Sequence, residues 1–291
     1  MQNELVKRLL ILLIILLIGG GISIAGGDGG GTFANIPVFV ICGAWAFLLN
    51  WLAFVPANAA QTEKYYDLVG SLTYLSMIGL AILLTTQVSN RGMIAAAMVA
   101  IWALRLGTFL FIRISNDGHD DRFDEIKVKP SRFFVAWTIQ GLWALVTAAC
   151  ALAIITGGDQ TPVGLIGKLG IIIWVVGFLI EVVADSQKRA FRKNPNNKGK
   201  FINTGIWSWS RHPNYFGEIT LWFGMAVMAI PVLSGLQWVT LISPIFVVFL
   251  LTKVSGIPTL AKKAKQRWGD DADYQAYVAN TSLLIPLPPK K

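Results

Sequence analysis

Long apolar runs dominate the chain and determine its predicted architecture. A helix needs about 17–25 residues to cross the hydrocarbon core of a bilayer. Six runs of roughly this length alternate with polar segments, at residues 9–26, 32–56, 68–88, 92–112, 133–158 and 160–180. The pattern predicts six membrane-spanning helices over this part of the chain.

A further uncharged stretch, Ile219 to Thr252, is too long for one crossing. As a single helix it would measure about 51 Å, against a hydrocarbon core of about 30 Å. Pro231 and the pair Ser234-Gly235 interrupt it, so we interpret it as a hairpin of two spans. The predicted fold class is all-α, a polytopic integral membrane helical bundle of eight spans.

The first run, 9–26, has two interpretations. Lys7 and Arg8 precede it, as in a secretory signal peptide, but the small-residue tract 26–31 that follows has no clear cleavage pattern. We favour an uncleaved span. The tract also lacks the Lys-Ser/Thr of a phosphate-binding loop, so we predict a flexible connector. The expected division is an N-terminal hydrophobic segment with this connector at 1–31 and a membrane domain at 32–291.

Positive charge lies on one side of the predicted bundle. With the N-terminus in the cytoplasm, all but three of the 25 Lys and Arg residues fall on the cytoplasmic side. The exceptions are Arg91, in an outer loop, and Arg105 and Lys168, inside spans. This bias predicts that both termini are cytoplasmic. It also accounts for the net charge of +9 without nucleic-acid binding.

Composition excludes an ordinary soluble enzyme. Charged residues make up 14% of the chain, whereas soluble domains carry about 25%. Because His119 and His212 are the only histidines, we expect no histidine-rich metal centre, and we interpret the acidic residues around His119 as a solvated loop. Cys42 and Cys150 lie in apolar runs and are predicted to be buried, unreactive thiols.

Charged residues inside or beside spans are the first candidates for chemistry. Arg105 lies within the fourth span, where an arginine faces a partner or a wet cavity unless it snorkels to the interface. Glu181 and Asp185 are four residues apart at the end of the sixth span, on one helix face. Either they pair with Lys188 or Arg189, or they hold the sugar hydroxyls of a nucleotide.

The segment from Asp185 to Tyr215 is the most informative. Its first half is dense in Arg and Lys, and its second half mixes Trp, Arg, His and Asn. A solvated cytoplasmic loop with interfacial aromatic residues explains the charge. It does not explain the polar run Arg211-His-Pro-Asn-Tyr215, which leads into an apolar span that has Glu218 at its start. These side chains make a ready polar pocket at a helix N-terminus.

The string Gly205-Ile-Trp-Ser-Trp-Ser-Arg-His-Pro-Asn-Tyr-Phe-Gly-Glu218 resembles the C-terminal signature of the steroid 5-alpha-reductase family, in its bacterial branch. The tail, with Tyr274 and Leu284-Ile-Pro-Leu-Pro, is similar to the C-terminal end of that family. The resemblance runs from about Trp51 onward and implies a seven-span family core with an extra N-terminal span. The Arg-His-Pro-x-Tyr string also resembles membrane sterol reductases and isoprenylcysteine carboxyl methyltransferases, which use NADPH and S-adenosylmethionine respectively.

The resemblance implies NADPH as cofactor. NADPH carries a pyrophosphate and a 2′-phosphate that need Arg or Lys donors, which the basic half of the segment offers. Asp185, Arg189 and Arg192 match positions at its adenosine and phosphate end. Asn214 and Glu218 match positions near the nicotinamide, and Tyr274 matches a tail tyrosine that closes over the cofactor. The remaining expected cofactor-binding residues are Arg105, Arg122, Trp209, Arg211, His212 and Tyr215.

The substrate side departs from the family pattern. The human-type enzymes have a Gln-Glu pair on an early span and a tyrosine on the next span. Here Gln61-Thr-Glu-Lys-Tyr-Tyr-Asp67 stands near the first place, and Trp102 falls at the second. The catalytic candidates, in order of preference, are Asp67, Glu63 and the phenols of Tyr66 or Tyr65. All four can equally be interface residues.

The implied activity is NADPH-dependent reduction of the C4–C5 double bond of a 3-oxo-Δ4 steroid or a similar lipophilic enone. A protein acid would hydrogen-bond to the ketone oxygen and stabilise the enolate. The alternatives are an S-adenosylmethionine-dependent membrane methyltransferase and a non-enzymatic lipid transporter or binder, although transport sites usually lie at the bilayer midplane. We expect a monomer in the bacterial inner membrane, with membrane lipids and a bilayer-borne substrate as partners.

Overall fold

The computed structural model describes residues 2–117, 120 and 123–289. Eight helices in this part of the chain are long and apolar enough to cross a membrane. They are Leu5–Gly26, Val38–Ala59, Tyr66–Leu84, Asn90–Ile112, Pro130–Thr156, Leu165–Lys193, Pro213–Val232 and Gly235–Trp268. The predicted all-α polytopic membrane fold is confirmed. The predicted hairpin over 219–252 is confirmed as well, because the last two spans are separate and break at Leu233-Ser234.

The chain divides into two compact units. Unit 1 comprises Met1–Gly164 and Ala229–Ser243, and unit 2 comprises Leu165–Met228 and Pro244–Lys291. The sequence-based division at residue 31 concerns a different feature, the added N-terminal span, and stays a prediction.

Unit 1 is built around one central helix. Its α-helices are α1 (Gln2–Gly26), α2 (Val38–Ala59), α3 (Tyr66–Leu84), α4 (Asn90–Asp117), α5 (Asp124–Lys127) and α6 (Pro130–Thr156), and its second part adds the 3-10 segments η4 (Ile230–Val232) and η5 (Gly235–Leu241). Helix α6 begins with proline at its first position, where the missing N–H costs no helical bond. Helices α1 to α5 all contact α6, and 89% of its apolar window is buried. Trp137, Leu145 and Leu152 on α6 are among the largest fully buried side chains of the core.

The added N-terminal helix is hydrogen-bonded within unit 1 at both ends. At one end the Arg8 guanidinium donates to the hydroxyl of Ser131. In the turn just after the other end, the Leu236 N–H donates to the Asp28 carboxylate over 2.8 Å. Between them α1 packs closely on α2, since a Cβ added at Gly19 would lie 2.6 Å from the Phe47 ring. Helix α1 is therefore part of the fold of unit 1.

The glycine-rich tract after α1, interpreted from sequence as a flexible connector, is held by main-chain hydrogen bonds. Gly31 N–H donates to the Thr156 carbonyl over 2.7 Å, and Val38 N–H donates to the Gly31 carbonyl over 2.9 Å. Between these bonds lies a short hairpin of β1 (Thr32–Phe33) and β2 (Ile36–Pro37). The tract thereby fastens the start of α2 to the end of α6.

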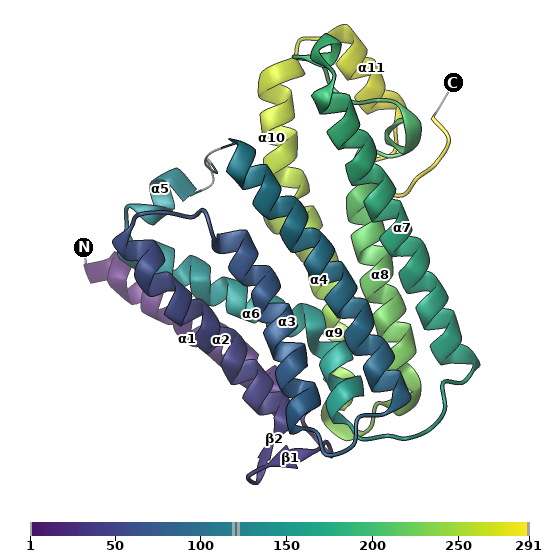
Figure 1. The fold of residues 1–291 in the computed structure, drawn as a ribbon. Helices are drawn as coiled ribbons and strands as arrows, with labels where there is room; N and C mark the ends of the chain where they lie inside the picture. The colour runs from purple at the N-terminus through teal and green to yellow at the C-terminus, as the bar shows by residue number, and fades with distance from the viewer. Residues whose placement is uncertain (1, 118–119, 121–122, 290–291) are drawn as a thin grey trace. The chain divides into compact units, whose positions relative to one another are not determined.

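Unit 2 contains two long helices and a set of shorter segments. These are α7 (Leu165–Lys193), the 3-10 segments η2 (Pro195–Asn197) and η3 (Gly205–Ser208), α8 (Pro213–Ala229), most of α9 (Ile242–Phe249) with the π-helical turn Leu250–Val254, α10 (Ile257–Trp268) and α11 (Ala272–Asn280). Helices α7 and α8 lie side by side (Figure 1). The extended tail after α11 carries the chain back to the segment before α8.

Candidate functional site

Glycines set the distance between α7 and α8. A Cβ added at Gly177 would lie 2.5 Å from the Leu221 nitrogen, and one at Gly224 would lie 2.5 Å from the Trp174 nitrogen. The two backbones therefore touch along the helix pair, as small residues allow in membrane proteins. A Cβ at Gly217 would lie 2.6 Å from the Glu181 nitrogen. This packing brings the polar end of α7 against the first turn of α8.

The polar contact at that end joins two predicted cofactor residues. The Asn214 side-chain amide donates to the Asp185 carboxylate over 3.3 Å. Asp185 is almost fully buried, so this hydrogen bond helps to offset the cost of burying a polar side chain. Glu218 lies one turn after Asn214 on α8, and Glu181 lies buried one turn before Asp185 on α7.

Two arginines extend the same side of α7. Arg189 and Arg192 follow Asp185 by four and seven residues, which places all three on one helix face. Both arginines are exposed, at the end of α7 where basic residues complement the helix dipole. The face thus runs from a buried carboxylate to exposed guanidinium groups.

The motif before α8 is fixed against α7 by its own side chains and backbone. Gly205 has a φ of +61°, which glycine adopts without strain. The Gln187 side chain accepts a hydrogen bond from Ile206 N–H over 3.0 Å, and the indole of Trp207 donates to the Ala184 carbonyl over 3.0 Å. The Lys188 ammonium lies 4.6 Å from the centre of the Trp207 ring.

His212 is an uncharged, stacked histidine near neutral pH. Its ring lies parallel to that of Tyr215, at 8° and with centroids 5.5 Å apart. Burial lowers the pKa of His212 from 6.5 to about 4, and the charges of Lys188 and Arg211 also lower it. The ring can therefore accept or donate a hydrogen bond but is a poor source of a proton at pH 7.

The C-terminal tail pairs with the same motif. Arg211 N–H donates to the Ser282 carbonyl over 2.8 Å, and Leu287 N–H donates to the Trp209 carbonyl over 3.0 Å. The fully buried Ser210 hydroxyl donates to the Leu284 carbonyl over 2.7 Å. Trp209 and Arg211, both expected at the cofactor, are thus held by the tail.

Tyr274 lies in an aromatic cluster. Its ring is 5.1 Å from that of Phe201 and 5.8 Å from that of Trp268. The Trp268 indole in turn donates to the Gly199 carbonyl over 2.6 Å. The cluster fastens the basic loop after α7 to α10 and α11. The predicted closing of Tyr274 over a cofactor stays a prediction.

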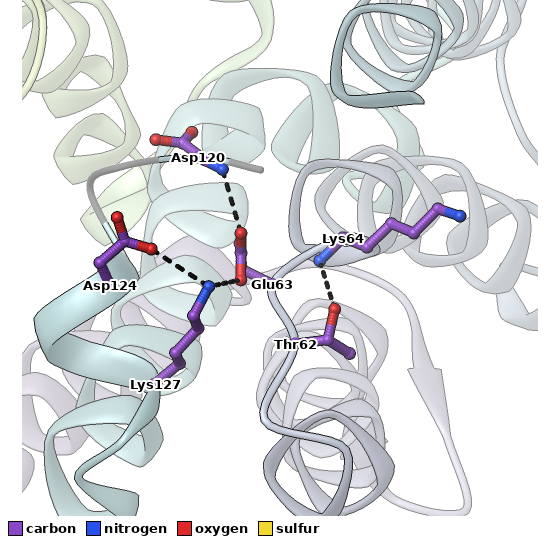
Figure 2. Close-up of polar contacts among 6 residues, drawn as sticks. All are labelled: Thr62, Glu63, Lys64, Asp120, Asp124 and Lys127. Atoms are coloured by element: carbon purple, nitrogen blue, oxygen red, sulfur yellow. Dashed lines mark hydrogen bonds and ion pairs between the residues drawn. The ribbon is translucent and has the colours of Figure 1, made fainter. Parts of the chain in front are cut away.

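The early-span candidates belong to unit 1, and Glu63 has a structural partner there. Figure 2 shows Asp120, Asp124 and Lys127 around its carboxylate, which lies between α2 and α3. Lys127 donates over 2.9 Å and the Asp120 N–H over 3.0 Å. Burial alone would raise the pKa of Glu63, but these hydrogen bonds and the charge of Lys127 lower it below its usual value. Glu63 is therefore ionised at neutral pH.

The two tyrosines of this segment differ in burial. The Tyr66 phenol donates to the Ala136 carbonyl over 2.9 Å, and its ring packs against Phe123 and Trp137. Tyr65 is exposed and lies beside Lys64. The phenol proton of Tyr66 is thus already donated to the backbone.

The remaining unit 1 candidates lie on α3 and α4. Asp67 is half-buried in the first turn of α3. Arg105 is half-buried on α4, with its guanidinium carbon 5.7 Å from the centre of the Phe109 ring. Arg122 lies outside the described residues.

Comparison with known proteins places the chain in a family. Residues 53–281 match the family described as "Protein of unknown function (DUF1295)". The chain belongs to this family, which is steroid 5-alpha-reductase-like. The predicted resemblance is therefore confirmed. The match includes all the candidate site residues and leaves out helix α1 and the end of the tail.

Three curated relatives align with parts of this family member. The "Probable O-methyltransferase ustE" of Ustilaginoidea virens is 34% identical over 101 residues, which are 34% of this chain and 35% of that protein. "Steroid 5-alpha-reductase DET2" of Gossypium hirsutum is 41% identical over 59 residues, 20% of this chain and 23% of that protein. "3-oxo-5-alpha-steroid 4-dehydrogenase 1" of Rattus norvegicus is 29% identical over 117 residues, 40% of each.

The aligned part of the chain spans between 23% and 40% of the length of these relatives. No solved structure matches the chain.

Sequence reasoning missed several polar residues inside the spans of unit 1. Asn50 is fully buried and donates to Thr73 over 3.0 Å, and Gln140 donates to the Tyr66 carbonyl over 2.8 Å. The side-chain oxygens of Asn50 and Gln140 are buried and accept no hydrogen bond from the described residues. Each amide lies in the middle of an apolar helix, and a sequence search for such polar positions could have found both.

Proposed function

We propose that this protein is a membrane reductase that uses NADPH to reduce the C4–C5 double bond of a 3-oxo-Δ4 steroid or a similar lipophilic enone. Membership of a steroid 5-alpha-reductase-like family supports a reductase. Two of the aligned relatives bear names of that activity. We further propose a bacterial inner-membrane location with the cofactor residues in the cytoplasm, since the Lys and Arg distribution favours that orientation.

The main observation behind the proposal is the group of polar side chains where α7 ends and α8 begins. A carboxylate held by an amide, followed on the same face by two arginines, suits a nucleotide with sugar hydroxyls and phosphates. The Nε of Arg211 is a further buried donor with no acceptor among the described residues. We assign Asp185, Arg189 and Arg192 to the adenosine and phosphate end, and Asn214 and Glu218 to the nicotinamide end.

NADPH, when bound, supplies the hydride. The chain must hold the nucleotide, exclude water and offer a hydrogen-bond donor to the ketone oxygen, where negative charge develops. Glu63 is ionised and the Tyr66 phenol is engaged with the backbone. Asp67 stays our first candidate for the acid, and Tyr65 is the alternative phenol.

A second candidate function is methyl transfer from S-adenosylmethionine. It is favoured by the relative named as a probable O-methyltransferase, which is 34% identical over 101 residues. S-adenosylmethionine carries no phosphate, so the arginines on α7 would have no phosphate to bind. Cofactor identity separates the two functions.

The first experiment is a thermal-stability titration of the detergent-purified protein with each cofactor. A ligand that binds only the folded state stabilises it by about 2.7 kcal/mol at a hundredfold excess over Kd. We expect NADPH to raise Tm and S-adenosylmethionine to leave it unchanged. If only S-adenosylmethionine raised Tm, the proposed reductase function would be wrong and methyl transfer would be favoured. No shift with either cofactor, in a folded preparation, would favour a lipid transporter or binder.

The site assignment is tested by Asn214→Ala and Glu218→Ala. Both are expected to abolish NADPH-dependent enone reduction while the protein still inserts and folds, because each removes a polar group assigned to the nicotinamide end. Asn203→Ala is the matched control, since Asn203 is an exposed asparagine before the same motif. Near-normal turnover in both site variants would refute the assignment.

A further inference from the structure

The C-terminal tail, Ser282 to Leu287, has half-buried side chains on one side and exposed side chains on the other. From Ser282 to Leu287, along a segment that bends at residues 283–285, half-buried and exposed side chains alternate strictly. Leu283, Ile285 and Leu287 point outward and are 43%, 56% and 53% exposed. A loop segment that faces water normally places polar residues there. Here the outward row is entirely apolar.

The tail is not a loose end. Three hydrogen bonds tie it to residues 209–211, two through backbone N–H groups and one through the Ser210 hydroxyl. Residue Ser282 also forms a parallel bridge with Ser210. Its register is therefore fixed, and so is the outward direction of the apolar row. The apolar row therefore lies on a segment whose position is held by hydrogen bonds.

The same contacts place the apolar row beside the polar end of α7 and the start of α8 in unit 2. Arg211, which pairs with Ser282, lies two residues before Pro213, where α8 begins. The indole N–H of Trp207 donates a hydrogen bond to the Ala184 carbonyl on α7, at the point where the apolar part of that helix ends. Trp209, whose carbonyl accepts from Leu287, is itself 48% exposed. Exposed tryptophans are typical of the membrane–water interface.

We propose that Leu283, Ile285, Leu287 and Trp209 form a lipid-contact strip at the headgroup–acyl boundary of the leaflet where α7 ends and α8 begins. Charge supports a lipid surface as the partner, because two lysines, Lys290 and Lys291, follow this row in the sequence. Apolar side chains followed by basic ones are the composition of segments that bind anionic membrane surfaces. The tail thus contacts the membrane with one edge and the motif before α8 with the other.

Fluorescence quenching in lipid nanodiscs tests this strip. The full-length protein would carry a single environment-sensitive label at Ile285→Cys, and Cys42 and Cys150 are both buried, so the introduced thiol reacts selectively. Ala276→Cys, on the exposed surface of α11, is the matched control. One quencher is a lipid with a spin label near the top of its acyl chain, and the other is aqueous iodide.

We expect the spin-labelled lipid to quench the label at residue 285 at least about twofold more than the label at 276, with the opposite order for iodide. Leu283→Cys and Leu287→Cys are expected to repeat the result, so the test does not depend on one variant. Quenching of all three by iodide but not by lipid would overturn the proposal in favour of a solvated tail. Protection from both quenchers would overturn it in favour of a protein-covered surface.

Discussion

At the scale of single residues, charge states decide what the candidate side chains can do. Glu63 and Lys127 form an ion pair that is only partly exposed, with 5% and 20% of their side chains accessible. Such a pair orders the segment around α5 onto the loop before α3. Its contribution depends on Glu63 remaining ionised.

Glu63→Gln is expected to destabilise the protein by about 1–2 kcal/mol, because Lys127 would lose its more buried charged partner and keep only the exposed Asp124, 3.2 Å away. The pKa of Glu63 is lower in the folded protein than its ordinary value of 4.5. Its stabilising effect is thus complete above about pH 4.5 and lost as pH falls through the folded-state pKa. Thermal unfolding measured against pH should show a smaller acid-side loss of Tm in the variant. Glu125→Gln, an exposed neighbour on α5, should behave as wild type.

His212 is uncharged at neutral pH, unlike Glu63, and it gives a second pH prediction. With a folded-state pKa of about 4 against 6.5 unfolded, unfolded chains gain a proton on His212 that folded chains do not. Stability should therefore fall as pH decreases from about 6.5 to 4. His212→Gln should remove part of that slope in a Tm-against-pH series. An unchanged slope would show that His212 is not buried as described.

At the scale of elements, glycine positions control the packing of α7 on α8. Gly177→Ala should cost about 1–3 kcal/mol because its Cβ would meet the backbone of Leu221. The control is Gly79→Ala on α3, where nothing lies within 4 Å of the added Cβ and alanine favours the helix. Tm values in one detergent give the comparison. Equal Tm values for the two variants would contradict the close backbone contact.

The same scale shows what sequence could and could not predict. Apolar length, with the interruptions at Pro231 and Ser234-Gly235, predicted the spans, because crossing a bilayer constrains length strongly. The family resemblance suggested Asp185 and Asn214, which the structure joins by a hydrogen bond. The partners of Glu63 and Tyr66 could not be predicted, since Lys127 and Ala136 are more than 60 residues away in sequence. Sequence also gave no sign that the tail pairs with residues 209–211.

At the scale of the whole molecule, the Lys and Arg distribution predicts orientation. All but three of the 25 basic residues fall on one predicted side, and the translocation cost of positive loops makes that the cytoplasmic side. Of the exceptions, Arg91 is buried, and its guanidinium donates to the Pro162 carbonyl over 3.1 Å. An arginine held inside the fold adds little to the exposed charge that orients a membrane protein.

Thiol accessibility in intact cells measures this orientation. Thr32→Cys, exposed in β1 beyond α1, should react with a membrane-impermeant maleimide from outside the cell. Asn203→Cys, exposed in the loop between α7 and α8, should react only after the membrane is permeabilised. The wild-type protein is the blank, because Cys42 and Cys150 are buried. The reverse labelling order would place the cofactor residues outside the cytoplasm, where NADPH is not supplied, and would count against the reductase as well as the topology.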